Sequence, residues 1–119
     1  MIAEDQIAAV NDFTVPFDIR RIPMPEKAIK QRVSLFAVNH SEGYSDWYIG
    51  TSEDTETALF EEHLVDRENG FYRALTTEGE KSTRKILKYY SGKGMECDFD
   101  LENVFDRIYV YRMENGTRP

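Results

Sequence analysis

The sequence contains a single cysteine, Cys97, in 119 residues. One thiol cannot form an intramolecular disulfide, and no second cysteine or nearby histidine completes a zinc or redox motif around it. No run of about 18 apolar residues is present that could form a transmembrane helix. The N-terminus also lacks the basic and apolar regions of a secretory signal peptide. These absences favour a reducing compartment, and we expect a cytoplasmic protein that contacts no membrane.

Motifs of the common catalytic classes are missing as well. The sequence has no phosphate-binding loop, serine nucleophile elbow, zinc cluster or CxxC pair. Of the two histidines, His63 shares a helical face with Leu59 and is expected to face inward in a structural role. His40 could join Glu42 and Asp46 in a metal site, although the polarity of a loop explains these residues equally well. We therefore expect no catalytic residues, no metal and no cofactor.

Basic residues are scarce relative to acidic ones, 15 against 22, and the formal net charge is -7. A chain of this charge repels DNA, RNA and anionic lipid unless its basic residues are locally segregated. Nucleic acid is therefore not an expected partner. Many of the acidic residues lie between positions 53 and 68. Most of that run should be a solvated face, and its functional interpretation is a surface that imitates nucleic-acid charge or docks on a basic protein.

Against these absences, the chain is rich in apolar and aromatic residues, at 40% and 13%. This composition and the length suit one globular domain over 1–119. Apolar residues at every second position predict strands over 13–19, 33–38, 47–50 and 107–113. A short helix over 1–12 is also plausible from its apolar spacing.

Two main helices are expected. The first starts near Ser52 or Asp54, whose side chains can accept hydrogen bonds from the first free amides, and runs to about Asp66. The second covers about 78–90, where Thr77 and Glu80 have the spacing of a capping box. The sequence thus predicts an α+β fold, with an antiparallel sheet of about four strands and two main helices packed on one face.

Alternation along the strands predicts a sheet with two different faces. The aliphatic set comprises Val33, Leu35, Ala37, Trp47, Ile49, Ile108 and Val110. The opposite positions are occupied by Phe36, Val38, Tyr48, Tyr109, Tyr111 and Met113. If the helices cover the aliphatic side, this second side is too apolar to face water. Its cover could be residues 1–19, a second copy of the protein or a ligand.

We expect this second side to be an association surface in a homodimer, because Tyr, Phe and Arg are enriched in protein interfaces. The candidate binding residues are Phe36, Tyr48, Tyr109, Tyr111 and Arg112. The leading hypothesis is a non-enzymatic binding or accessory protein. A second hypothesis is a small-molecule-binding domain or small enzyme that uses the same surface as a pocket, with Asp46 as base. A third is an acidic inhibitor of a nucleic-acid-binding protein.

One short segment resembles a known family. Tyr48-Ile49-Gly50 on a predicted strand, followed by a helix that ends in Glu62-His63, looks like part of the GIY-YIG endonuclease module. Leu35-Phe36-Ala37 stands where that module has its first triplet, and the helix expected over 54–66 has no arginine. The catalytic residues of the family are therefore not carried over, and we expect no metal-dependent nuclease activity.

Overall fold

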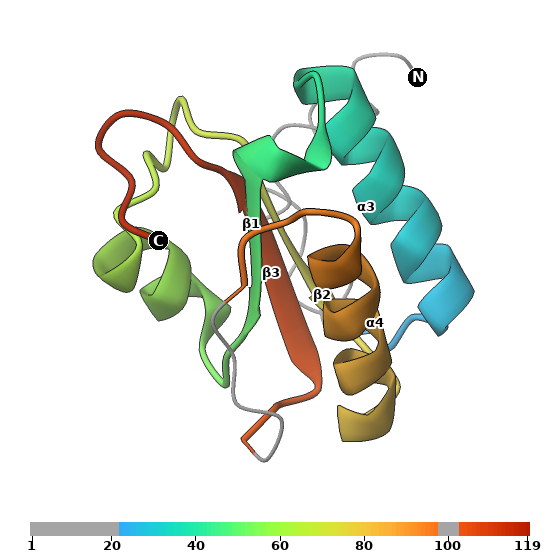
Figure 1. Cartoon of the computed structure of the whole chain (residues 1–119). Coiled ribbons are helices and arrows are strands. Elements are labelled where there is room, and N and C mark those ends of the chain that lie inside the picture. The colour runs from blue at the N-terminus through green and yellow to red at the C-terminus, as the bar shows by residue number, and fades with distance from the viewer. Residues whose placement is uncertain (1–21, 98–102) are drawn as a thin grey trace, which may run out of the picture.

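A computed structural model describes residues 22–97 and 103–119 of the chain. Its elements, in chain order, are α3 (Glu26–His40), the 3-10 helix η2 (Tyr44–Asp46), β1 (Trp47–Thr51), the π-helix η3 (Thr57–Glu62), β2 (Tyr72–Thr76), α4 (Glu80–Gly92) and β3 (Arg107–Arg112). Helices and strands are mixed along the chain (Figure 1). The predicted α+β class is therefore confirmed, as are the strands expected at 47–50 and 107–113.

The described sheet has three antiparallel strands in the order β1-β3-β2. The last strand in the sequence is thus the central one, and Tyr111 of β3 is paired with Tyr48 on one side and Tyr72 on the other. The strand expected at 13–19 and the helix expected at 1–12 lie outside the described residues. A fourth strand is therefore not part of the described sheet.

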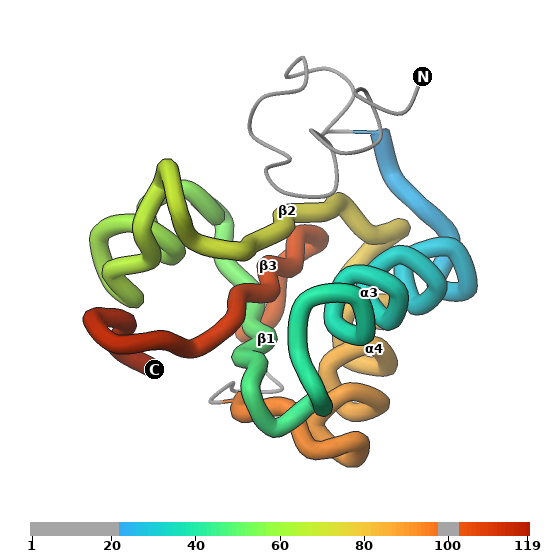
Figure 2. The backbone as a smooth tube through the Cα atoms, turned by 90° about the horizontal axis from the view of Figure 1, so that it is seen from above, coloured from blue at the N-terminus to red at the C-terminus, as the bar shows by residue number. Residues whose placement is uncertain are grey.

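Two separate core clusters flank the sheet. The first contains the aliphatic strand positions Trp47, Ile49, Leu75, Ile108 and Val110 together with buried side chains of α3 and α4. The second contains Tyr48, Tyr72, Tyr109 and Tyr111 together with Ala58, Leu59 and Val65. In two perpendicular views, α3 and α4 lie to one side of the strands and the η3 region lies to the other (Figures 1 and 2).

Residues 33–38 are helical, so the predicted strand there and its hairpin with 47–50 are wrong. Pro25 stands at the N-cap of α3, and Glu26 lies in its first turn. Both positions suit these residues, since proline is tolerated where no amide is needed and a carboxylate is favoured at the positive end of the helix dipole. The buried side chains of α3 recur at helical spacing: Ile29, Val33, Phe36 and Ala37.

Strand β2 was not predicted, although every residue in it is buried. The sequence Tyr72-Arg73-Ala74-Leu75-Thr76 does not alternate simply between polar and apolar residues. Side chains of β2 contribute to both core clusters, Leu75 to one and Tyr72 to the other. A strand that is covered on both faces lacks the polar and apolar alternation by which half-exposed strands are recognised.

The helix expected at 54–66 begins as predicted but ends early. The Asp54 carboxylate accepts a hydrogen bond from the Thr57 amide at 3.1 Å. The regular helix stops at Glu62, and Leu64 adopts a left-handed conformation with φ of 57°. This backbone reversal is uncommon for leucine and directs the chain toward β2.

Helix α4 covers Glu80–Gly92 rather than 78–90. The predicted capping box does not form, because Gly79 is the N-cap residue and no side chain caps that end. The Thr77 hydroxyl instead accepts a hydrogen bond from the Gly79 amide at 3.2 Å and lies 2.8 Å from the Thr83 hydroxyl. Thr77 therefore ties the end of the helix to the chain that precedes it.

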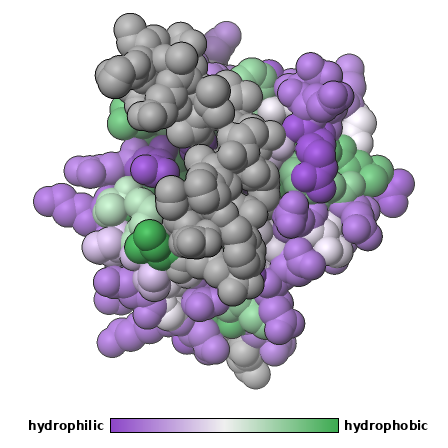
Figure 3. Space-filling view, turned by 180° about the vertical axis from the view of Figure 1, so that it is seen from behind, coloured by the Kyte–Doolittle hydropathy of each residue, from purple (hydrophilic) through white to green (hydrophobic). Residues whose placement is uncertain are grey.

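The described residues that are visible from behind are largely hydrophilic (Figure 3). In that view hydrophobic residues form small separate patches among the hydrophilic ones (Figure 3). Of the helices in the described part of the chain, none combines the length and the apolar composition that a bilayer-spanning segment needs.

Candidate functional site

Three of the predicted binding residues do lie together. Tyr48, Tyr109 and Tyr111 share one face of the sheet, and their rings gather around His63, whose ring centroid is 4.6 Å from that of Tyr48. The ring centroids of Tyr48 and Tyr111 are 5.2 Å apart in a stacked arrangement. We call these four residues the tyrosine–histidine cluster.

Hydrogen bonds fix the tautomer of His63 within this cluster. Its Nδ1 is 2.7 Å from the carbonyl oxygen of Arg118, which can only accept, so Nδ1 carries a proton. Nε2 then accepts a hydrogen bond from the Tyr109 hydroxyl at 2.8 Å. The Arg118 amide in turn donates to the His63 carbonyl oxygen at 2.7 Å. His63 thus joins the end of η3, β3 and the C-terminal residues.

The cluster is buried within the chain. Tyr48, Tyr109 and Tyr111 are 3%, 5% and 0% exposed, and the η3 region and the residues around Arg118 contact the cluster. Burial raises the pKa of Tyr109 and of Tyr111 well above the usual range, so both phenols stay protonated at neutral pH. A second copy or a ligand could reach these side chains only if η3 or the C-terminal residues moved away.

Phe36 and Arg112 lie away from this cluster. Phe36 belongs to α3 and packs edge-on against Trp47 with ring centroids 5.1 Å apart, on the aliphatic side of the sheet. Arg112 donates from Nη1 to the carbonyl oxygen of His40 at 2.5 Å and pairs through Nη2 with Glu114 at 2.7 Å. The expected single surface of five residues is therefore divided, because the segment that contains Phe36 is a helix and not a strand.

The histidine considered for a metal site has a packing role. His40 is the last residue of α3, and its ring lies 5.0 Å from that of Phe36 and 4.8 Å from that of Phe71. Desolvation, followed by the charges of Arg112 and Arg73, lowers its pKa. Within residues 22–97 and 103–119, no three His, Cys, Asp or Glu side chains gather in a way that could hold a metal ion.

Charge is strongly segregated in the folded chain. Helices α3 and α4 together carry seven lysines and arginines and two glutamates. Residues 52–69, which we call the acidic segment, carry seven aspartates and glutamates and one arginine. The helices and the acidic segment lie on opposite sides of the sheet (Figure 2). An acidic protein thus presents a basic side, which we call the α3–α4 surface.

Tyr90 joins the two basic helices. Its hydroxyl donates to the carbonyl oxygen of Lys30 at 2.7 Å and accepts from the Ser34 hydroxyl at 2.8 Å. The neighbouring Tyr89 is 37% exposed, and the ammonium groups of Lys30 and Lys93 lie 4.1 Å and 5.3 Å from its ring centroid. The α3–α4 surface therefore combines exposed aromatic area with positive charge.

Two hollows open along this surface. A shallow one of about 600 Å³ lies between the helices and is lined by Glu26, Lys27, Lys30, Gln31, Ser34 and Tyr89. A deeper one of about 320 Å³ lies at the C-terminal end of α3 and is lined by Ala37, Val38, Ser41, Glu42, Gly43 and Tyr44. Sequence reasoning missed both hollows because they depend on α3. The helical spacing of Ile29, Val33, Phe36 and Ala37 was the available signal for α3.

Comparison with protein-family models, with curated proteins and with solved structures gives no match for this chain. No relative therefore assigns a role to the tyrosine–histidine cluster or to the α3–α4 surface. Because the tyrosine–histidine cluster is buried and the α3–α4 surface is exposed, the α3–α4 surface is the candidate functional site.

Proposed function

We propose that this chain is a non-enzymatic binding protein that holds an acidic protein partner on its α3–α4 surface. The segregation of charge carries the proposal: seven basic residues lie on two helices on one side of the sheet, although the whole chain has a formal charge of -7. Complementary potentials accelerate the encounter of two proteins and select the orientation in which they meet.

Exposure supports a binding role for the lysines of this surface. Lys27, Lys81, Lys85 and Lys88 are all exposed. Such side chains contribute little to the stability of the chain that carries them. They are nevertheless available to an incoming carboxylate.

Two features favour an acidic protein over nucleic acid. The α3–α4 surface exposes large apolar side chains beside its charges, Val38 at 65% and Tyr89 at 37%, and such a mixture is typical of protein interfaces. The acidic segment on the opposite side would repel a long polyanion. A compact acidic partner can contact the basic side alone.

The test measures binding of a fluorescent polyglutamate peptide to the full chain by anisotropy at low and at high ionic strength. We expect binding at low salt that weakens steeply as salt is added, because exposed charges are screened beyond a Debye length of about 10 Å at 0.1 M. Lys88→Glu should weaken binding about threefold, since one exposed charge pair contributes up to about 1 kcal/mol.

Arg118→Glu is the matched control, because it changes the net charge equally but lies beside His63, on the side of the acidic segment. We expect it to leave peptide binding within error of the unmodified protein. Equal losses in the two variants would indicate a response to net charge only, and absence of binding at low salt would overturn the proposal. A DNA duplex that binds more tightly than the peptide would instead assign the surface to nucleic acid.

The predicted homodimer can be tested by measuring self-association of the protein. The acidic segment of a second copy has the chemistry proposed for the partner, so sedimentation of the protein alone at low and high salt identifies self-association through charge. An apolar dimer would be insensitive to salt. A dimer that persists at high salt would indicate hydrophobic association, and the tyrosines predicted for that contact would have to become exposed, because they are buried within the chain.

The acidic segment supports a second candidate function, inhibition of a protein that binds nucleic acid. Hydrogen bonds from the backbone of Thr57 and of Asn69 lower the pKa of Asp54 and of Asp66, respectively, so these carboxylates stay ionised below neutral pH. The remaining acidic residues of the segment are exposed. A fixed array of exposed carboxylates can imitate the charge of a phosphate backbone.

Binding of a fluorescent polylysine peptide tests this second function. Glu61→Lys and Glu68→Lys, at exposed positions, should weaken polylysine binding, whereas Lys88→Glu should not. If the two glutamate variants bind polylysine as the unmodified protein does, the acidic segment is a solvated face only.

A further inference from the structure

We propose that the hollow at the C-terminal end of α3 binds a single apolar side chain of the acidic partner and so anchors it. This inference rests on the proposed function and names the residues that give it specificity. The hollow has a volume of about 320 Å³, near the lower end of the range of about 300–1,000 Å³ for small-ligand pockets. A pocket of that size fits one aromatic or large aliphatic side chain.

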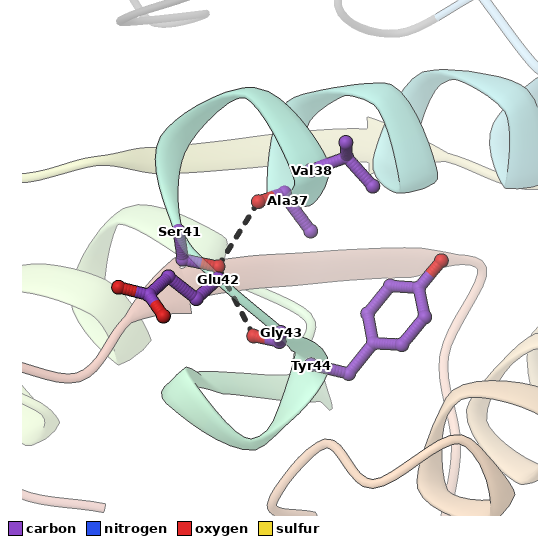
Figure 4. A pocket seen from close by; sticks show the side chains of 6 residues that line it. All are labelled: Ala37, Val38, Ser41, Glu42, Gly43 and Tyr44. Carbon is purple, nitrogen blue, oxygen red and sulfur yellow. Dashed lines mark hydrogen bonds between the residues drawn. The ribbon is translucent and has the colours of Figure 1, made fainter.

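The Ser41 hydroxyl in the wall of this hollow already has hydrogen-bond partners within the chain. Ser41 accepts a hydrogen bond from the indole nitrogen of Trp47 at 2.6 Å, and its hydroxyl lies 3.0 Å from the carbonyl oxygens of Ala37 and of Gly43 (Figure 4). An apolar guest would therefore leave the Ser41 hydroxyl with its partners. These hydrogen bonds of Ser41 matter because a guest that leaves a buried polar group without a partner binds poorly.

The opposing walls of the hollow are apolar. Val38 comes from α3, and Tyr44 is the first residue of η2 (Figure 4). The Tyr44 ring packs against that of Tyr90 with centroids 5.9 Å apart, which fixes its position. Val38 is 65% exposed. A guest side chain would remove this apolar surface from water, which is favourable in proportion to the area covered.

Charge makes the occupant an acidic segment. Ser34, in the shallow hollow, and Val38, in the deeper one, are one helical turn apart on α3. A chain anchored at Val38 can therefore continue between the helices toward Lys30 and Lys93, whose ammonium groups lie over Tyr89. The carboxylate of Glu42 points away from Val38 and Tyr44 (Figure 4).

The probe is a fluorescent peptide in which glutamates flank a single phenylalanine on both sides. One control peptide has alanine in place of the phenylalanine, and another has lysines in place of the glutamates. If the hollow accepts the anchor, the phenylalanine peptide should bind the full chain about tenfold more tightly than the alanine peptide. The lysine peptide should not bind.

The chain offers a closely matched pair of variants. Val38 and Leu35 lie on the same helix and are 65% and 63% exposed, but only Val38 lines the hollow. Val38→Glu should remove the advantage of the phenylalanine peptide, while Leu35→Glu should change its affinity about twofold or less. Because both side chains are largely exposed, neither variant should unfold the protein.

The outcomes separate this inference from the function on which it rests. If the phenylalanine and alanine peptides bind equally, or if the two variants lose equal affinity, the anchor site is wrong and the basic surface alone binds the partner. If the glutamate peptides do not bind at low salt, the proposed function and the anchor both fail.

Discussion

The hydroxyl of Tyr109 donates a hydrogen bond to Nε2 of His63 at 2.8 Å, across 46 positions of sequence. Both residues are buried, His63 at 9% and Tyr109 at 5% exposed. This bond ties the central strand to the residue that follows η3. The same bond supplies the buried Nε2 of His63 with a hydrogen-bond donor.

Tyr109→Phe should therefore destabilise the protein. The substitution leaves Nε2 of His63 buried without a donor, and an unsatisfied buried acceptor costs about 1–3 kcal/mol. Equilibrium unfolding in urea measures the loss. Tyr89→Phe, at a partly exposed ring, should change the midpoint little. If Tyr109→Phe leaves the free energy of unfolding unchanged, the phenol hydroxyl is not required and water takes its place beside Nε2.

Gly50→Ala tests the same ring from the opposite strand. Gly50 pairs with Tyr109 in the sheet, and a Cβ at this glycine would lie 2.6 Å from the Tyr109 oxygen. Because His63 holds the phenol in place, the ring cannot move without loss of that hydrogen bond. We expect a destabilisation of about 1–3 kcal/mol. Gly92→Ala, where a Cβ meets nothing within 4 Å, should be neutral or stabilising in the same denaturation experiment.

Leu87→Ala should cost about 2–5 kcal/mol, because the side chain is fully buried between α4 and the aliphatic face of the sheet. Its exposed neighbour provides the comparison, since Lys88→Ala should change stability by less than about 0.5 kcal/mol. Urea melts of the two variants give both numbers. Equal small losses would place Leu87 on the surface.

Alkali should unfold the protein. Burial raises the pKa of Tyr90 from 10.0 to about 12, and burial also raises the pKa of Tyr109 and Tyr111. Because the unfolded chain loses these protons first, their contribution to stability is complete below pH 10 and declines as pH rises toward 12 and beyond.

Circular dichroism and phenolate absorbance, followed together against pH, measure this effect. The late-titrating phenols should ionise together with the loss of helix signal. Tyr90→Phe should reduce the alkaline loss of stability and should lower stability at neutral pH by about 0.5–1.5 kcal/mol, since its hydrogen bond to Lys30 disappears. If every tyrosine ionises while the protein is still folded, the raised pKa values of Tyr90, Tyr109 and Tyr111 are wrong.

The sequence was sufficient for elements with one polar and one apolar face. Helix α4 was predicted within two residues of its observed ends, because Thr83, Ile86, Leu87 and Tyr90 recur at helical spacing between charged residues. The alternation of Tyr48 and Tyr111 with aliphatic neighbours also placed these tyrosines together, as observed. Periodicity carries this information whenever one side of an element faces solvent.

One error in α3 produced the error about the aromatic side of the sheet. Apolar residues at every second position of 33–38 favour a strand, but Ile29, Val33, Phe36 and Ala37 recur at helical spacing and form the buried side of a helix on the aliphatic face. The helix that starts after Asp54 was assigned to that face instead. With α3 in its place, the η3 region covers the tyrosines, and the face that required a second copy is covered within the chain.

The central position of β3 determines when the sheet can form during synthesis of the chain. Neither β1 nor β2 pairs with the other, and each is bonded to β3. A nascent chain that has emerged only as far as α4 contains two strands without the partner that joins them, and its aliphatic and aromatic surfaces stay open. Sheet assembly therefore waits for residues 107–112 to leave the ribosome, and this interval is when the growing chain is most exposed to aggregation and to capture by chaperones.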